Sequence, residues 1–336
     1  MDHIILKPGK LDAELLEKLV FKNVKHRRPE VLVRPGVGED CATLDFGPYE
    51  CVMSTDPITA AISDIGRLAV HITCNDIASN GVEPLGIMLA VMLPPGTTAG
   101  DVRRIMEQAS EVSEELGVEI IGGHTEITPA VNRPVIVSTA VGRALAGGSQ
   151  RASGMRPGDL IYMTKYAGLE GCGILASDYR EELSGVLTGE ELAEARDYLK
   201  HVSVLKEGVA AGKVGTAGMH DITEGGVLGA VWELAEIADV GLLLQEQDIP
   251  VTDVIRKITS HFGIDPLRLI SSGSMMIIVH PDRAAALEEA IEASGVALSK
   301  IGQVLPREEG RRIESAGGSR RVIDPPGSDE LYRVVR

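Results

Sequence analysis

The chain has 336 residues, enough for about two domains, and its 33 lysines and arginines against 49 aspartates and glutamates give a formal net charge of −16. This acidity and an aromatic content of 3% argue against a nucleic-acid partner, because phosphate neutralisation needs clustered cations and base stacking needs aromatic rings. No apolar run approaches the ~18 residues of a membrane span, and no secretory signal pattern opens the sequence. We therefore expect neither a membrane-spanning helix nor secretion. Four widely spaced cysteines favour reduced thiols and a cytoplasmic location.

The first half of the sequence alternates strand and helix patterns. Apolar residues at helical spacing predict helices over 64–80 and 101–116. Short apolar runs predict strands over 31–33, 50–54, 85–93, 118–121 and 134–141. We expect the second of these strands to end at Thr55-Asp56-Pro57 and the fourth to lead into the sequence Gly122-Gly123-His124-Thr125-Glu126.

A change of composition separates the two halves. Glycines, a proline and small polar residues gather over 146–149 and 154–158, so we place a boundary near residue 150, between an N-terminal domain (1–150) and a C-terminal domain (151–336). The second half predicts strands over 159–164 and 274–279, and helices over 190–199, 227–238 and 284–293. The polar stretch 307–336 is expected to be loosely held. Both domains are assigned to the α+β or α/β class.

Three aspartates of the first half are candidate metal ligands. Asp40 follows a glycine-rich loop, Asp56 ends a predicted strand, and Asp76 lies beside Asn75 inside an otherwise apolar helix. Mg²⁺ prefers carboxylates together with substrate phosphates, so a convergence of these acids would suit phosphoryl transfer. Asp40 or Asp56 alone could equally be a turn former or a helix cap. Asp76 must either reach solvent or meet a cation, and both outcomes stay open.

The second half has one distinctive stretch, which covers residues 219–227. Gly225 and Gly226 open a predicted helix, and free N–H groups there would bind a phosphate or another anion. The alternative is an ordinary helix capped by Thr223, with Asp221 and Glu224 as partners of the helix dipole. His124, after the Gly-Gly pair of the first half, is by itself more typical of a hydrogen-bonded structural histidine than of a metal ligand.

Taken together, these motifs resemble the AIR synthase (PurM) superfamily of ATP-using enzymes. The resemblance covers nearly the whole chain and rests on residues 38–42, 54–57, 75–78, 122–126, 158–159, 221–227, 241 and 249–250. It implies a two-domain PurM-like architecture with a homodimer built through the N-terminal domains. It also implies ATP near the domain interface and Mg²⁺ held by acids of the first domain.

The resemblance assigns roles residue by residue. It implies that the metal ligands are Asp40, Asp56 and Asp76. It implies that the nucleotide site also includes Asn75, Gly122, Gly123, Thr125, Glu126, Asp221, Glu224, Gly225 and Gly226. The acid that usually follows Gly-Gly in the superfamily is His124 here, which leaves a metal role at this position open.

Within the superfamily the chain is most similar to the HypE family of hydrogenase maturation proteins, through residues 219–226, 233–235, 240–241, 265–267 and 301–304. HypE ends in a Pro-Arg-Ile-Cys tail whose cysteine receives a carbamoyl group that ATP helps dehydrate to a thiocyanate. This sequence has no cysteine after Cys172, which lies between two glycines in a predicted loop. We therefore do not expect the HypE reaction in its known form.

Three functions remain open at this point. The first is an ATP- and Mg²⁺-dependent enzyme that activates an oxygen of an unknown small substrate by phosphoryl transfer. The second is a kinase similar to thiamine-monophosphate kinase, because Gly38-Glu39-Asp40 resembles that family's acidic motif. The third is a non-catalytic nucleotide-binding maturation factor. Release of ADP would separate the two enzymes from the binding protein.

Overall fold

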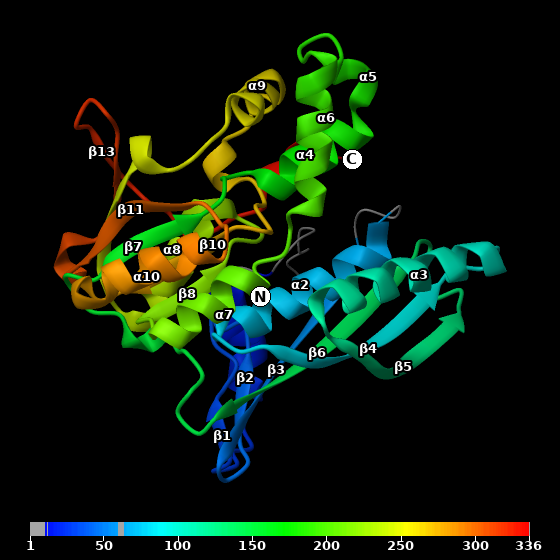
Figure 1. Ribbon diagram of the computed structural model, residues 1–336, viewed down its shortest axis with the longest axis horizontal. Coiled ribbons are helices and arrows are strands. Elements are labelled where there is room, and N and C mark those ends of the chain that lie inside the picture. Colours follow the sequence, from blue (N-terminus) through cyan, green and yellow to red (C-terminus); the bar gives the residue numbers. More distant parts are fainter. Residues whose placement is uncertain (1–10, 12, 60–63, 336) are drawn as a thin grey trace.

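The computed structural model describes residues 11, 13–59 and 64–335 and contains two mixed sheets, each covered by helices (Figure 1). Sheet A has the strand order β1-β2-β3-β6-β4-β5. The bounds are Val31–Val33 for β1, Ala42–Asp45 for β2, Tyr49–Ile58 for β3, Pro84–Leu93 for β4, Glu119–Ile127 for β5 and Val135–Leu145 for β6. Strands β4 and β5 are parallel and the other neighbours are antiparallel.

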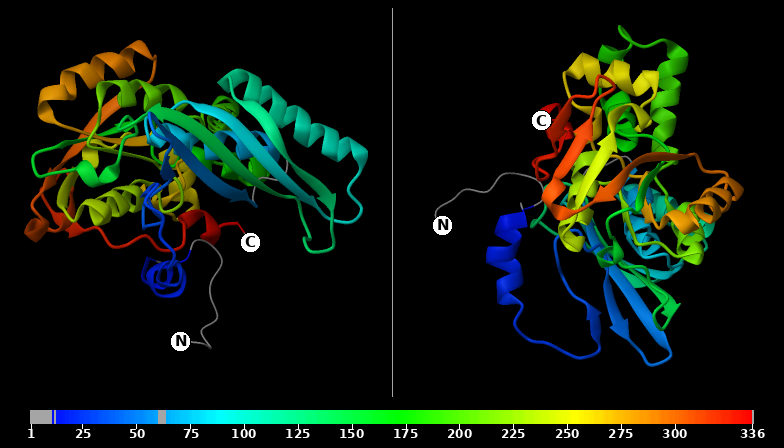
Figure 2. Two further views of the ribbon diagram at one scale, coloured as in Figure 1. Left: turned by 90° about the horizontal axis from the view of Figure 1, so that it is seen from below. Right: turned by 90° about the vertical axis from the view of Figure 1, so that its left-hand side faces the viewer.

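Two helices cover one face of sheet A, and the opposite face carries no described helix of this sheet's own domain (Figures 1 and 2). Helix α2 spans Ile65–Ser79 and helix α3 spans Ala99–Leu116. Thr98 and Asp101 form a reciprocal capping box at the start of α3. The apolar stripe of α3 that the sequence predicts is buried through Ile105, Ala109 and Val112.

Sheet B has the order β13-β12-β9-β11-β7-β10-β8. The bounds are Leu160–Thr164 for β7, Gly218–Asp221 for β8, Gly241–Gln245 for β9, Met275–Val279 for β10, Leu298–Leu305 for β11, Arg311–Glu314 for β12 and Arg320–Val322 for β13. Side chains of β10 alternate between two apolar clusters, because successive residues of a strand face opposite sides. Met276 and Ile278 pack with α8 (Gly226–Ala238), whereas Met275 and Ile277 pack with α7 (Leu205–Val214) and α10 (Ala284–Ala293).

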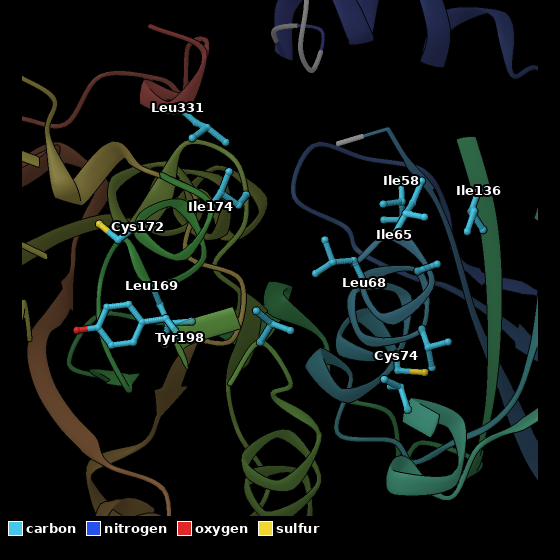
Figure 3. Close-up of a cluster of buried hydrophobic side chains, with 14 of the residues drawn as sticks. Ile58, Ile65, Leu68, Cys74, Ile136, Leu169, Cys172, Ile174, Tyr198 and Leu331 are labelled. Atoms are coloured by element: carbon cyan, nitrogen blue, oxygen red, sulfur yellow. The ribbon is translucent and has the colours of Figure 1, made fainter. Parts of the chain in front are cut away.

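A group of helices projects beyond sheet B (Figure 1). It consists of α4 (Leu169–Asp178), α5 (Arg180–Leu183), α6 (Gly189–Asp197) and α9 (Asp253–Phe262). Figure 3 shows Cys172 of α4 beside Leu169 and Tyr198 in the apolar interior of this group. The predicted loop around Cys172 is therefore wrong, because the thiol is fully buried in a helix.

The two domains meet where α2 packs on α7 and β8. Glycines allow this approach: a Cβ atom at Gly208 would lie 2.5 Å from the Ala78 carbonyl oxygen, and one at Gly212 would lie 2.5 Å from the Gly81 Cα. Strands β6 and β7 end and begin at Leu145 and Leu160, on either side of the predicted boundary at residue 150.

Two further predictions about elements are wrong. Strand β3 does not end at Asp56 but continues through Pro57 to Ile58. Proline is tolerated there because β2 pairs with β3 only as far as Met53, so Pro57 has a neighbouring strand on one side alone. The stretch from residue 307 is not loose either, since it forms β12 and β13 and buries Ile313, Ile323 and Leu331.

Near the start of the described chain, α1 (Ala13–Leu15) continues as a helical segment over Leu16–Val20. Of the helices within the described ranges, none combines the length and the apolar character needed to cross a membrane.

Candidate functional site

Four aspartates from separate elements converge where the domains meet. Asp40 lies in the loop before β2, Asp56 on β3, Asp76 on α2 and Asp221 at the end of β8. Asp76 is close enough to the other three for each of their charges to raise its pKa. The first domain therefore supplies three of the acids and the second domain completes the group, which we call the acid site.

Asp76 is the centre of the acid site. Its carboxylate is 7% exposed and accepts a hydrogen bond from the Ser54 hydroxyl. Burial raises its pKa well above the usual range, and the charges of Asp56, Asp221 and Asp40 reinforce that shift. An acid in this setting favours a partner that brings positive charge, because an isolated buried carboxylate is costly.

Asp221 is the most deeply buried of these acids, at 1% exposure. Its backbone N–H donates to the Ser79 hydroxyl over 3.0 Å, which fixes the end of β8 against α2. Neither of its carboxylate oxygens has a hydrogen-bond partner. Ligand atoms of Asp40, His220 and Asp221 all lie within 4.8 Å of one another, a spacing that can hold a metal ion.

His220 balances part of the negative charge. Its Nδ1 donates to the Asp221 carbonyl oxygen over 2.6 Å, and its Nε2 lies 3.2 Å from a Glu233 carboxylate oxygen and 3.5 Å from an Asp40 oxygen. Burial opposes the charged imidazole, but the Asp40 charge, the Asp221 carboxylate 3.8 Å from Nδ1 and Glu233 outweigh burial and raise the pKa of His220 well above its usual range. The positive charge of this imidazole compensates part of the negative charge of the neighbouring acids.

The site chemistry suits a hard divalent cation. The oxygen donors are Asp40, Asp56, Asp76 and Asp221, and carboxylate oxygens are the ligands that Mg²⁺ prefers. Asp221 Oδ1 lies 3.8 Å from His220 Nδ1, too far for a hydrogen bond, so neither carboxylate oxygen has a hydrogen-bond donor. This fits such an ion, because buried carboxylates are otherwise hydrogen-bonded.

Several other predicted site residues have partners within the protein. The Asn75 side chain hydrogen-bonds to the second domain: its Nδ2 donates to the Val202 carbonyl oxygen and its Oδ1 accepts from the Val204 N–H.

At the start of α8, the Gly225 N–H donates to Asp329 over 2.7 Å and the Gly226 N–H to the Thr223 carbonyl oxygen over 3.1 Å. Glu224 accepts a hydrogen bond from the Tyr332 hydroxyl over 2.9 Å. An anion at this helix start would have to displace Asp329.

The predicted stretch from Gly122 to Glu126 lies on β5, at the edge of sheet A. The register places Asp56 opposite Ser138, Ser138 opposite Leu89, and Leu89 opposite Gly123. Three steps of about 4.8 Å separate Asp56 from Gly123 by roughly 14 Å. The four predicted residues Gly122, Gly123, Thr125 and Glu126 are exposed, as is His124, whose Nε2 lies 3.4 Å from Glu126. Within one chain the structure does not bring them to the acid site.

A cavity of about 700 Å³ opens beside the loop that carries Asp40. Its lining comes from the first helical segment, from residues 36–39 and from α8, and it includes Trp232. The Arg311 guanidinium lies 4.6 Å from the centre of the Trp232 ring. The size suits a small organic ligand.

Sequence reasoning missed three residues that shape the site. They are His220, which lies against Asp40 and Asp221, Glu233, which contacts His220, and Ser79, which accepts a hydrogen bond from the Asp221 N–H. The one local signal was that His220 directly precedes Asp221 in the motif 219–227.

The fold and this site define a two-domain protein of known type. Residues 38–144 match the N-terminal domain of the AIR synthase related proteins, and residues 156–314 match their C-terminal domain. The chain therefore belongs to the AIR synthase related family and has its two-domain PurM-like fold.

Individual members of the family are similar to this chain over nearly its whole length. A hydrogenase expression/formation protein of Methanocaldococcus jannaschii is 30% identical over 97% of both chains. The carbamoyl dehydratase HypE of Rhodobacter capsulatus is 29% identical over 97% of this chain and 95% of its own. Among solved structures, a hydrogenase maturation protein HypE in complex with ATP superposes with a TM-score of 0.73, at 25% identity over 98% of each chain.

Proposed function

We propose that this protein is an ATP- and Mg²⁺-dependent enzyme that activates an oxygen atom of a small substrate by phosphoryl transfer. The observation that carries the proposal is the acid site, where Asp221 keeps two buried carboxylate oxygens without hydrogen-bond donors. The HypE structure that contains ATP has the same fold across nearly the whole chain, which supports a nucleotide as the ligand.

Asp40 and Asp221 would hold Mg²⁺, with Asp56 and Asp76 as neighbouring carboxylates. When bound, Mg²⁺ neutralises the phosphate oxygens between which the phosphoryl group is transferred. The chain's own groups then position the reactants. His220 holds Asp40 and Glu233 in place through its Nε2, and the Ser54 hydroxyl orients Asp76. The depth of the site limits water, which strengthens each of these charge interactions.

The nucleoside would lie in the cavity next to residues 36–39. Trp232 lines this cavity and is the single tryptophan of the sequence. Its fluorescence therefore reports on occupancy of the cavity without a label. We expect Mg·ATP to change the emission of the wild-type protein in a saturable way, and Mg²⁺ alone to leave it unchanged.

The oxygen that ATP activates would not belong to a group attached to a cysteine of this chain. The four cysteines are Cys41, Cys51, Cys74 and Cys172. Three of these thiols are buried and Cys51 is partly covered. Burial raises the pKa of the Cys74 thiol to about 12 and raises that of Cys172 further, so neither forms the nucleophilic thiolate at neutral pH. Intact-mass measurement after incubation with ATP and a carbamoyl donor should show no added carbamoyl or cyano group on these cysteines.

We further propose a homodimer formed through the open face of sheet A. On strands β4 and β5 the large apolar side chains of Met88 and Ile121 are each more than 40% exposed, and Ile121 lies against Gly86, two residues before Met88 on the same side of β4. Exposed apolar groups gathered on one surface favour association. Light scattering should give the mass of two chains for the wild type and of one chain for Met88→Asp. Val322→Asp, at an exposed apolar position on β13, is the control and should remain dimeric.

Release of ADP tests the catalytic proposal. The wild-type protein should release ADP from ATP in the presence of Mg²⁺, slowly without substrate, and lose this activity when EDTA removes the metal. Glu289→Gln removes an exposed carboxylate of α10 and should behave as wild type. Tight ATP binding with no ADP formed by the wild type, with or without added carboxylate and amide substrates, would favour a non-catalytic binding protein.

A further inference from the structure

Residues 329–335, which we call the latch segment, lie against the start of α8. The Asp329 carboxylate accepts hydrogen bonds from the Gly225 N–H over 2.7 Å and from the Leu331 N–H over 2.8 Å. Gly225 is the residue before α8, in a left-handed conformation with φ of 88°. The latch segment therefore places its own carboxyl group on the helix start where the sequence predicts a bound anion.

The latch segment is also anchored by apolar contact. Leu331 is 7% exposed and belongs to the same cluster as Leu169 and Ile174 of α4 (Figure 3). The Tyr179 hydroxyl donates to the Val334 carbonyl oxygen over 2.8 Å. These contacts lie outside both sheets, so the segment can separate while both sheets stay intact.

Glu170 lies beside the latch segment without adequate partners. It is 5% exposed, and its Oε2 has no hydrogen-bond partner. The other groups that act on it are Ser272, which hydrogen-bonds the carboxyl group, and the negative charges of Asp329 and Glu224.

The arginines of the adjoining segments have other partners. Arg333 pairs with Glu330 over 2.6 Å, and Arg268 donates to the Asp324 carbonyl oxygen over 3.4 Å. Glu330 also accepts a hydrogen bond from the Asp265 N–H. The closed latch thus gathers Glu170, Glu224, Asp329 and the Tyr332 phenol, and no arginine of these segments pairs with any of them.

We propose that residues 329–335 form a proton-sensitive latch: protons held by Glu170 and Asp329 keep the segment closed on the start of α8, and their loss releases it from the Gly225 N–H. The latch is independent of the reaction proposed above, because it requires neither nucleotide nor metal.

The direction of the pH effect follows from linkage. Burial raises the pKa of Glu170 to about 7 from an ordinary 4.5, and raises that of Asp329 to about 6 from 3.8. The closed state therefore binds more protons than the released state, in which both groups return to their ordinary values. Closure is strongest below pH 4, weakens as the pH rises toward 7, and changes little above that.

Hydrogen exchange of the full-length protein, followed by mass spectrometry, tests the latch. Peptides covering residues 329–335 are compared from pH 5 to pH 8 after correction for the intrinsic exchange rate. We expect the equilibrium constant for opening to rise at least about tenfold over this range. A constant that does not change or that falls with pH contradicts the latch. An equal rise at the core amides of β10 also contradicts it, because the event would then be global unfolding.

Two substitutions assign the effect. Glu170→Gln should reduce the rise in the opening constant between pH 5 and pH 8 to the smaller part that Asp329 contributes, while the control Glu289→Gln should follow the wild type. If Glu170→Gln does not fold, Asp329→Asn is measured instead. Its opening constant should rise less with pH than that of the wild type, because only Glu170 then contributes. A wild-type pH dependence in either folded variant would overturn the assignment.

Discussion

Asp221 and Asp329 are two aspartates near the start of α8 that are buried almost equally, at 1% and 2% exposure. Asp329 accepts hydrogen bonds from the backbone N–H groups of Gly225 and Leu331. Asp221 has no hydrogen-bond donor on either carboxylate oxygen and shares its surroundings with three other acids. A buried carboxylate that is satisfied by backbone donors holds the fold together, whereas one that lacks donors is prepared for a ligand that brings positive charge.

The largest expected effect follows from Asp221→Asn. The substitution keeps the shape of the side chain and removes a charge that Mg²⁺ requires, so Mg²⁺-dependent ADP release should fall by about a hundredfold or more, since even loss of an outer partner of a metal ligand costs 10–100-fold. An undiminished rate of ADP release in Asp221→Asn would show that Asp221 is not a metal ligand.

Gly212→Val tests whether the acid site depends on contact between the domains. A Cβ at this position would lie 2.5 Å from the Gly81 Cα, and backbone cannot move aside cheaply. We expect a loss of about 3 kcal/mol in the free energy of unfolding, together with weaker Mg·ATP binding. Gly189→Ala is the matched control, because a Cβ there meets nothing within 4 Å. Denaturant titration measures both variants, and equal stability would contradict close packing of α2 on α7.

Asp329→Ala has the smallest expected effect. It tests whether Asp329 stabilises the fold without taking part in ligand binding. The variant loses two hydrogen bonds from backbone donors to a carboxylate, which corresponds to about 2 kcal/mol. Thermal unfolding should show this loss, while the affinity for Mg²⁺ and ATP should stay within about twofold of wild type. A loss of nucleotide affinity as large as that of Asp221→Asn would remove the distinction between the two aspartates.

Local pattern was enough to predict the elements that carry the acids of the first domain. Helices α2 and α3 repeat apolar residues at helical spacing, and both form close to the predicted bounds. Asp76 was identifiable because a carboxylate inside an apolar helix needs a partner. The structure brings Asp40, Asp56, Asp76 and Asp221 together, whereas metal binding at these residues stays a prediction.

The remaining features depend on contacts between distant segments. Gly171 and Gly173 lower helix propensity around Cys172, but α4 forms because these glycines let Leu269 and Leu199 approach closely. Ile313, Ile323 and Leu331 are isolated apolar residues in a polar stretch, so no periodic signal marks their burial. His220 becomes a site residue only because Asp40 of the other domain lies 3.5 Å away.

Titration calorimetry measures whether the acid site binds Mg·ATP. The wild-type protein should bind ATP when Mg²⁺ is present and much more weakly when it is absent. Asp76→Asn should weaken Mg·ATP binding at least about tenfold, because it removes a carboxylate from the centre of the site. Glu289→Gln should bind as wild type does. Unchanged Mg·ATP affinity in Asp76→Asn would contradict the account.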